Sequence, residues 1–216
     1  MKRTIYKIGF WSGLIAFSST VAFGVAQALQ LFGVFNYPLD EILIYTFSLG
    51  IVVPLLVEMS VLHYATADDK KFWSHTALIF MVIYAVFVTA NYVVQLATVI
   101  PMTVSGESDK ITILKQTPHS LFWDFDAIGY ICMGLATLFA APLFEGRGFQ
   151  KWVRYSLLAN GLVTPLIAFV YFYPTFSEKL LLIGIPWVIT APLFMLMLAL
   201  NFKKNLTSYD QQESTL

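Results

Sequence analysis

The chain has few charged residues. They make up 12% of its 216 residues, against 58% that are apolar, whereas about a quarter of the residues of a soluble domain are charged. Thirteen basic and thirteen acidic side chains cancel, and no basic stretch is long enough to follow a phosphate backbone, which excludes nucleic acid as a partner. This composition is typical of a protein that is embedded in a lipid bilayer.

Motifs for metals, cofactors and common catalytic sites are also missing. The single cysteine, Cys132, lies in an apolar run, which excludes a disulfide framework and a cysteine-based zinc site. His63, His75 and His119 show neither of the histidine spacings that bind zinc on a helix. No Gly-x-Ser-x-Gly elbow, phosphate-binding glycine loop or Cys-x-x-Cys pair occurs. The sequence therefore predicts no metal and no cofactor, and it favours a protein that is not an enzyme.

Long apolar stretches dominate the sequence. A helix needs about 20 apolar residues to cross the hydrocarbon core of a bilayer. Six stretches meet this length: residues 8–34, 42–62, 76–100, 121–144, 153–173 and 180–202. The sequence predicts an all-α integral membrane protein, a bundle of six transmembrane helices over residues 1–204. A disordered cytoplasmic tail is predicted over residues 205–216.

The basic residues are unevenly distributed over the predicted loops. Ten of the thirteen lie before the first span, in the second and fourth loops, or after the sixth span, and only Lys110, Lys115 and Lys179 lie on the other side. Because basic loops stay in the cytoplasm, both termini are predicted to be cytoplasmic, in the plasma membrane or the inner membrane of a bacterium. In an alternative reading, a signal peptide is cleaved after Ala26-Gln27-Ala28, but the apolar run continues past that site.

The second and fifth spans each contain a proline with a glycine four residues before it: Gly50 and Pro54, Gly161 and Pro165. Proline removes the hydrogen bond to that earlier carbonyl, so each helix is expected to kink. The first and fourth spans carry small residues at every fourth position, a pattern for close packing: Ser18, Ala22 and Ala26, and Cys132, Ala136 and Ala140. These pairs are compatible with a three-plus-three repeat, which would be inverted as in many transporters. Chance similarity between apolar sequences is the alternative.

Glu58 is an acidic residue inside the second predicted span. It follows Pro54 by one turn and lies about 6 Å from the cytoplasmic end of its span, at about 1.5 Å per residue. An ionisable side chain inside a membrane needs a partner or a function. Glu58 is predicted either to bind a proton or cation beside the carbonyl that Pro54 frees, or to pair with Lys7, Lys70 or Arg154 at the membrane edge.

A second set of polar residues gathers in the outer half of the predicted bundle. Asn91 and Gln95 lie one turn apart in the third span, and Asp126 and Tyr130 lie one turn apart in the fourth. If these faces meet, they form an outward-facing pocket whose candidate ligand-binding residues are Gln27, Gln30, Asn91, Gln95, Asp124, Asp126 and Tyr130. In the alternative reading the amides join helices and the two acids lie at the water interface. The external loop 101–120 is either a lid or a plain connection.

These features favour a transporter-like membrane protein, or one that binds a small molecule or ion, with Glu58 as an ion- or proton-coupling site. One alternative is an intramembrane enzyme that acts on a lipid through the acids at the outer rim. The other is a non-catalytic subunit that packs against a membrane partner or a second copy through the Ser18, Ala22 and Ala26 stripe. In each case the lipid bilayer is the main partner.

Overall fold

The computed structural model describes residues 2–213, which form helices and loops without a strand. Six helical segments of this range are long and apolar enough to cross a membrane, by their length and composition. They contain the long helices α1 (Lys2–Leu31), α2 (Leu39–Ala65), α3 (Lys71–Val94), α5 (Leu121–Ala140), α6 (Gly148–Phe172) and α8 (Ile185–Glu213). The predictions of an all-helical fold and of six helices long and apolar enough to span a membrane are confirmed for the described residues.

Short helical segments extend or connect the long ones. A π-helical turn, η2 (Gln95–Val99), and the short helix α4 (Ile100–Val104) continue α3. The other short segments are η1 (Asp68–Lys70), η3 (Ser108–Leu114), η4 (Ala141–Leu143), α7 (Glu178–Leu181) and η5 (Leu182–Gly184). Most of them lie where the chain reverses direction between two spans.

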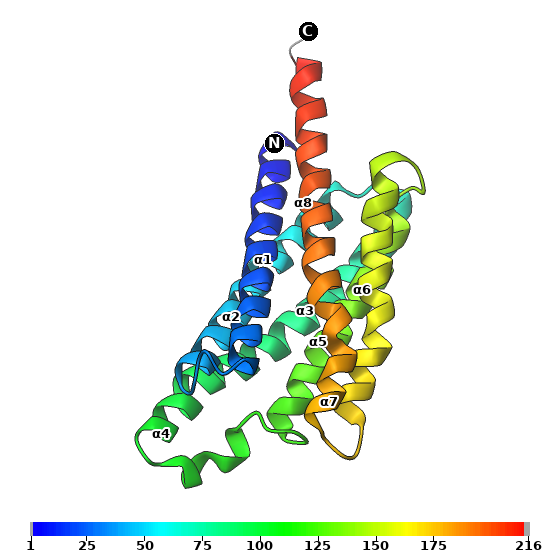
Figure 1. Ribbon diagram of the computed structural model, residues 1–216. Helices are drawn as coiled ribbons and strands as arrows, with labels where there is room; N and C mark the ends of the chain where they lie inside the picture. The colour runs from blue at the N-terminus through cyan, green and yellow to red at the C-terminus, as the bar shows by residue number, and fades with distance from the viewer. Residues whose placement is uncertain (1, 214–216) are drawn as a thin grey trace.

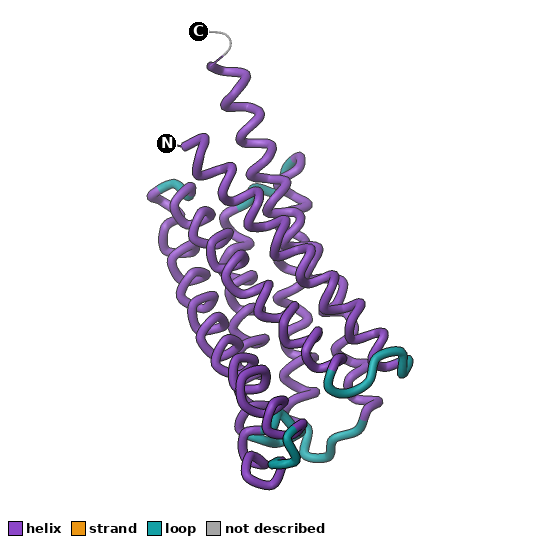
Figure 2. Tube along the Cα trace, turned by 90° about the vertical axis from the view of Figure 1, so that its left-hand side faces the viewer, coloured by secondary structure: helices purple, strands orange, loops and turns teal. Residues whose placement is uncertain are grey.

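The long helices form a closed ring in chain order. Each packs mainly against its neighbours in the sequence, from α1 through α2, α3, α5 and α6 to α8, and α1 in turn packs against α8. The helices run along one common direction, as the two views show (Figure 1, Figure 2). Side chains that point to the inside of this ring are therefore shielded from lipid by neighbouring helices.

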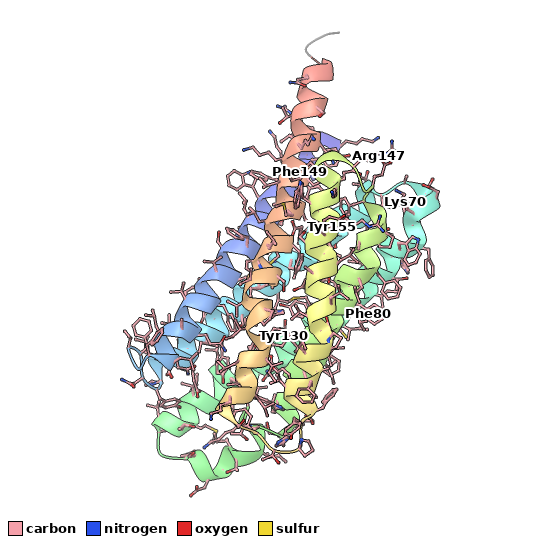
Figure 3. All side chains as sticks on the ribbon, turned by 45° about the vertical axis from the view of Figure 1, so that its right-hand side comes forward. Lys70, Phe80, Tyr130, Arg147, Phe149 and Tyr155 are labelled. Atoms are coloured by element: carbon pink, nitrogen blue, oxygen red, sulfur yellow. The ribbon has the colours of Figure 1, made fainter. Side chains whose placement is uncertain are left out.

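The two ends of the bundle differ in composition. Both termini lie at one end, here called the terminal end, whereas α4 and α7 lie at the opposite end (Figure 1). Lys70 and Arg147, from two different loops, also lie at the terminal end (Figure 3). This end therefore collects the loops that contain most of the basic residues.

The predicted inverted repeat is not confirmed. An axis in the membrane plane turns a bundle over, and so it reverses the sense in which successive helices follow one another around a ring. Here α1, α2 and α3 follow in the same sense as α5, α6 and α8, because the whole ring is in chain order. Helices α2 and α6 also continue as single α-helices through Pro54 and Pro165.

The face that α1 turns to the interior differs from the predicted small-residue stripe. Its buried residues are Gly9, Gly13, Ala16, Thr20, Phe23 and Ala26, whereas Ser18 is exposed. Only Ala26 belongs to both sets. In α5 the predicted positions Cys132, Ala136 and Ala140 are all buried, so small residues do serve helix packing there.

The end of the last helix differs from the sequence prediction, whereas the start of α5 agrees with it. Helix α8 continues to Glu213, so residues 205–213 of the predicted disordered tail are helical, and residues 214–216 lie outside the described range. A helix that is already formed extends without a new nucleation cost, which accounts for this continuation. Helix α5 begins at Leu121, where the Ser120 hydroxyl accepts a hydrogen bond from the Trp123 N–H.

Candidate functional site

A buried carboxyl group, that of Asp126 in α5, lies at the centre of a hydrogen-bond network near the end of the bundle opposite the termini. Its side chain is 4% exposed. The Tyr92 hydroxyl donates to Oδ1 over 2.7 Å, and the Tyr171 hydroxyl donates to Oδ2 over 2.5 Å. The network therefore joins α3, α5 and α6 around one acidic group.

The third donor to Asp126 comes from the loop between α4 and α5. Gln116 Nε2 donates to Asp126 Oδ2 over 3.1 Å, and Gln116 Oε1 accepts from Asn91 Nδ2 over 3.0 Å. The loop thus inserts one amide between two helices.

Gln95 holds the backbone of the same loop. Its Nε2 donates to the Leu114 carbonyl over 2.8 Å, and its Oε1 accepts from the Gln116 N–H over 3.2 Å. Gln95 begins the π-helical turn η2, in which the Ile100 N–H bonds to the Gln95 carbonyl. Such turns are frequent at functional sites, and here the turn ends two residues before Pro101, which has no N–H to give.

Aromatic rings from further helices surround the network. Tyr45 of α2 stacks on Tyr92 with 5.3 Å between ring centroids. Tyr130, one turn after Asp126, lies 6.3 Å from the Tyr171 ring and 4.8 Å from the Trp187 ring of α8. Tyr130 lies in the half of the bundle away from the termini (Figure 3). The carboxyl group therefore has mostly aromatic neighbours.

Two polar atoms near this network have no hydrogen-bond partner among the described residues. They are Asn91 Oδ1 and Trp187 Nε1, and both side chains are buried, Asn91 completely. No ion pair with Asp126 is found in the described range either, where Lys110 and Glu107 form an exposed pair. The site thus holds an acidic group without a counter-charge and a free acceptor on a neighbouring helix.

The structure brings together some of the predicted ligand-binding residues. Asn91, Gln95 and Asp126 meet through the Gln116 side chain or backbone, with Tyr130 beside them. Asp124 is exposed and takes no part. Gln30 bonds to Asp40 Oδ2 over 2.8 Å instead, and Gln27 is only partly buried in α1.

Glu58 lies in a second polar position, close to the terminal end. It is fully buried, and neither carboxyl oxygen has a hydrogen-bond partner in the described structure. A Cβ atom added to Gly13 would lie 2.1 Å from Glu58 Oε1 and 2.8 Å from the Ala199 methyl group. The carboxyl group therefore fills the space that Gly13 leaves between α1, α2 and α8. The alternative pairing with Lys7, Lys70 or Arg154 is not found among the described contacts.

A third polar cluster joins α5, α6 and α8. Along the bundle it lies between the Asp126 network and Glu58. Asn160 Nδ2 donates to the Thr137 hydroxyl, and Thr190 donates to Asn160 Oδ1, each over 3.3 Å. Sequence reasoning did not single out these residues, because single polar residues on three different spans show no pattern until the helices are placed. Their mutual hydrogen bonds indicate a role in helix association.

Sequence reasoning also missed Gln116, Tyr171 and Trp187. Gln116 lies in an irregular loop, where no periodicity indicates which side chain points inward. Tyr171 and Trp187 lie at the ends of apolar spans, where aromatic residues usually mark the membrane interface. The one available signal was the high content of tyrosine, 11 residues, in helices whose outer surfaces face lipid.

A cavity of about 310 Å³ opens at the terminal end of the ring. Its lining includes Tyr6 of α1, Leu62 of α2, Gln150 of α6, and Asn201 and Phe202 of α8. Leu62 lies one turn beyond Glu58 on the same face of α2. Among residues 2–213, no three histidine, cysteine or acidic side chains lie close enough together to hold a metal ion.

No protein-family model, no curated protein sequence and no solved structure matches this chain. The geometry of the site is therefore the basis on which its function is argued.

Proposed function

We propose that this chain is a small transporter-like membrane protein that binds a small cation at Asp126. The observation that supports this most strongly is the buried carboxyl group with three neutral donors, Tyr92, Tyr171 and Gln116. Neutral donors orient a carboxylate and leave its charge in place. A cation or a proton is then the natural occupant, since uncompensated charge inside a membrane is costly.

The loop between α4 and α5 acts as the outer gate of this site. Gln116 and the two backbone contacts of Gln95 hold the loop over Asp126. Release of these few hydrogen bonds would expose the carboxyl group to the outer solution without a rearrangement of the six helices. The described conformation is accordingly the occluded one.

Glu58 serves as the coupling site at the other end of the ring. A carboxyl group without partners can take up a proton, because apolar surroundings tolerate the neutral acid far better than the ion. Helices α2 and α5 begin at the same end of the bundle. Glu58 lies 19 residues after the start of α2, and Asp126 lies 5 residues after the start of α5. Glu58 is therefore farther from that end by the rise of 14 helical residues, roughly 20 Å. The two acids thus lie on opposite sides of the membrane centre.

The terminal end faces the cytoplasm of the plasma membrane, or of the inner membrane in a bacterium. Ten of the thirteen basic residues belong to this end, as the positive-inside rule requires. A reporter fused after Lys204 should read cytoplasmic, and one placed between Gly106 and Lys110 should read external. The opposite pair of signals would invert the assignment of the gate.

An enzyme that uses two acids at the outer rim receives less support. Asp126 is buried in the network, whereas Asp124 is exposed two residues earlier. Residues two apart on a helix point in different directions, so these acids do not form a catalytic pair.

The proposal is tested by the thermal stability of the purified protein in detergent, measured against increasing Na⁺, K⁺, ammonium and proton concentrations. A cation that binds only the folded state stabilises it by an amount that grows with the logarithm of its concentration once that concentration exceeds the dissociation constant. Asp126→Asn should remove this stabilisation, and the matched control Asp124→Asn should keep it. Equal responses of the wild type and Asp126→Asn to every cation would contradict the proposed site.

A further inference from the structure

We infer that the site at Asp126 and Asn91 binds a primary ammonium group with a neighbouring oxygen acceptor, the chemistry of ethanolamine, in the place that the Gln116 amide now occupies. This inference rests on the proposed cation site and names the class of cation. It follows from the way in which the loop side chain fills the site.

The Gln116 amide has the polar pattern of such a ligand. Its nitrogen donates to Asp126 Oδ2 over 3.1 Å, and its oxygen accepts from Asn91 Nδ2 over 3.0 Å. The site thus selects a donor and an acceptor that lie close together in one small group, two bonds apart in the amide and three in ethanolamine. Gln116 has no charge, so it leaves the carboxylate uncompensated, whereas an ammonium group in the same position makes a stronger, charge-assisted hydrogen bond.

The free acceptor of Asn91 explains why the ammonium group should carry N–H bonds. Asn91 Oδ1 is fully buried and has no partner among the described residues. A primary ammonium group has three donors, enough for Asp126 and for a second acceptor. A quaternary ammonium group has none, and it could use only the aromatic rings nearby.

The size of the ligand follows from the side chain that it replaces. Gln116 reaches the site through two methylene groups, and the hydroxyl groups of Tyr92 and Tyr171 already occupy other positions around Asp126. The polar head must therefore be about as small as a carboxamide. Free amino alcohols and the headgroup of phosphatidylethanolamine share this chemistry, and the loop lies at the end of the bundle from which either could enter.

The test uses the full chain in detergent and four small probes: ethanolamine, ethylamine, choline and ethylene glycol. Binding is measured by calorimetry and by the shift of the unfolding temperature. Ethanolamine should bind most tightly, ethylamine more weakly because it lacks the oxygen, and choline roughly tenfold or more weakly because it lacks N–H donors. Ethylene glycol should not bind.

Variants show whether the probes bind at this site. Asp126→Asn should weaken ethanolamine binding by roughly tenfold or more, and Asp124→Asn should leave it unchanged. Gln116→Ala removes the internal competitor and should tighten binding several-fold, a gain that a misfolded protein does not produce. Choline binding as tight as ethanolamine, or ethanolamine binding that ignores Asp126→Asn, would overturn the inference.

A last comparison separates the two sources and the two proposals. Protein in vesicles of phosphatidylethanolamine should show weaker binding of free ethanolamine than protein in vesicles of phosphatidylcholine if the headgroup is the ligand, and equal binding if the free amine is. Stabilisation by Na⁺, K⁺ or protons that is lost in Asp126→Asn, without any response to ethanolamine, would overturn this inference and leave the proposed cation site intact. Absence of every cation response would overturn both.

Discussion

Replacement of Gly13 by alanine should destabilise the protein through the carboxyl group of Glu58. The added methyl group would lie 2.1 Å from Glu58 Oε1, 2.7 Å from Glu58 Cδ and 2.8 Å from the Ala199 methyl group. All three distances are far below van der Waals contact, and the surrounding helices leave little room for Glu58 to move. Overpacking of this kind costs about 1–3 kcal/mol, which corresponds to a fall in unfolding temperature of roughly 3–10 °C in a chain of this length.

The second variant, Glu58→Ala, should suppress most of this effect. Truncation removes the two closest atoms, so that of the three nearest atoms the Ala199 methyl group remains, at 2.8 Å from the new methyl group. On its own, Glu58→Ala should change stability little, because the cavity that it opens is offset by the loss of a buried carboxyl group without partners. The unfolding temperatures of the wild type, both single variants and the double variant form a double-mutant cycle with a coupling of about 1–2 kcal/mol.

Gly24→Ala is the matched control on the same helix. Its added methyl group would meet one atom, Val188 Cγ1, at 3.2 Å, and alanine is the better helix former. This variant should keep or slightly raise the unfolding temperature. If Gly13→Ala is as stable as the wild type, or if its loss persists unchanged in the Glu58→Ala background, Glu58 does not occupy the space beside Gly13 and the reasoning about its burial fails.

Three further predictions follow from other contacts. Gly134→Ala should lower the unfolding temperature by several degrees, because its methyl group would lie 1.6 Å from the Thr164 hydroxyl oxygen, and Thr164→Ala should restore part of the loss; no change would mean that α5 and α6 are further apart. Gln116→Lys should raise the unfolding temperature by pairing a tethered ammonium group with the carboxyl group that Gln116 now contacts, and the gain should vanish in the Asp126→Asn background. Glu58→Gln should leave thermal stability nearly unchanged and alter proton uptake in liposomes; wild-type uptake would remove the coupling role.

The helical fold could be predicted from the sequence because it depends on one property, the length of the apolar runs. Backbone groups in lipid must be hydrogen-bonded internally, so each run of sufficient length becomes a helix. The order of the helices around the ring could not be predicted in this way. It depends on which face of each helix carries small residues, and α1 turns Gly9, Gly13 and Ala16 inward rather than the stripe at Ser18.

The candidate site could be predicted in part for a related reason. Asn91, Gln95 and Asp126 are polar residues one turn apart or near a span end, and such positions stand out in an apolar sequence. Gln116 lies outside the spans, and Tyr171 at a span end resembles an ordinary interfacial aromatic residue, although each is in direct contact with Asp126. The pairing of Glu58 with a basic residue, one of its two sequence readings, is not among the described contacts. The sequence did not indicate its position beside Gly13, because a glycine on another helix creates a space that a single span does not reveal.

The ring in chain order bears on how the protein is made. As each helix after the first leaves the ribosome and enters the membrane, a neighbour in the ring is already there, since nearly all contacts between the long helices join consecutive spans. Contacts between neighbours in the sequence form quickly. The exception is the seam between α1 and α8, which must wait for the last helix and which also encloses the carboxyl group of Glu58. Until that helix arrives, this acid faces lipid or water, and the nascent five-helix intermediate is the form that cellular quality control would meet.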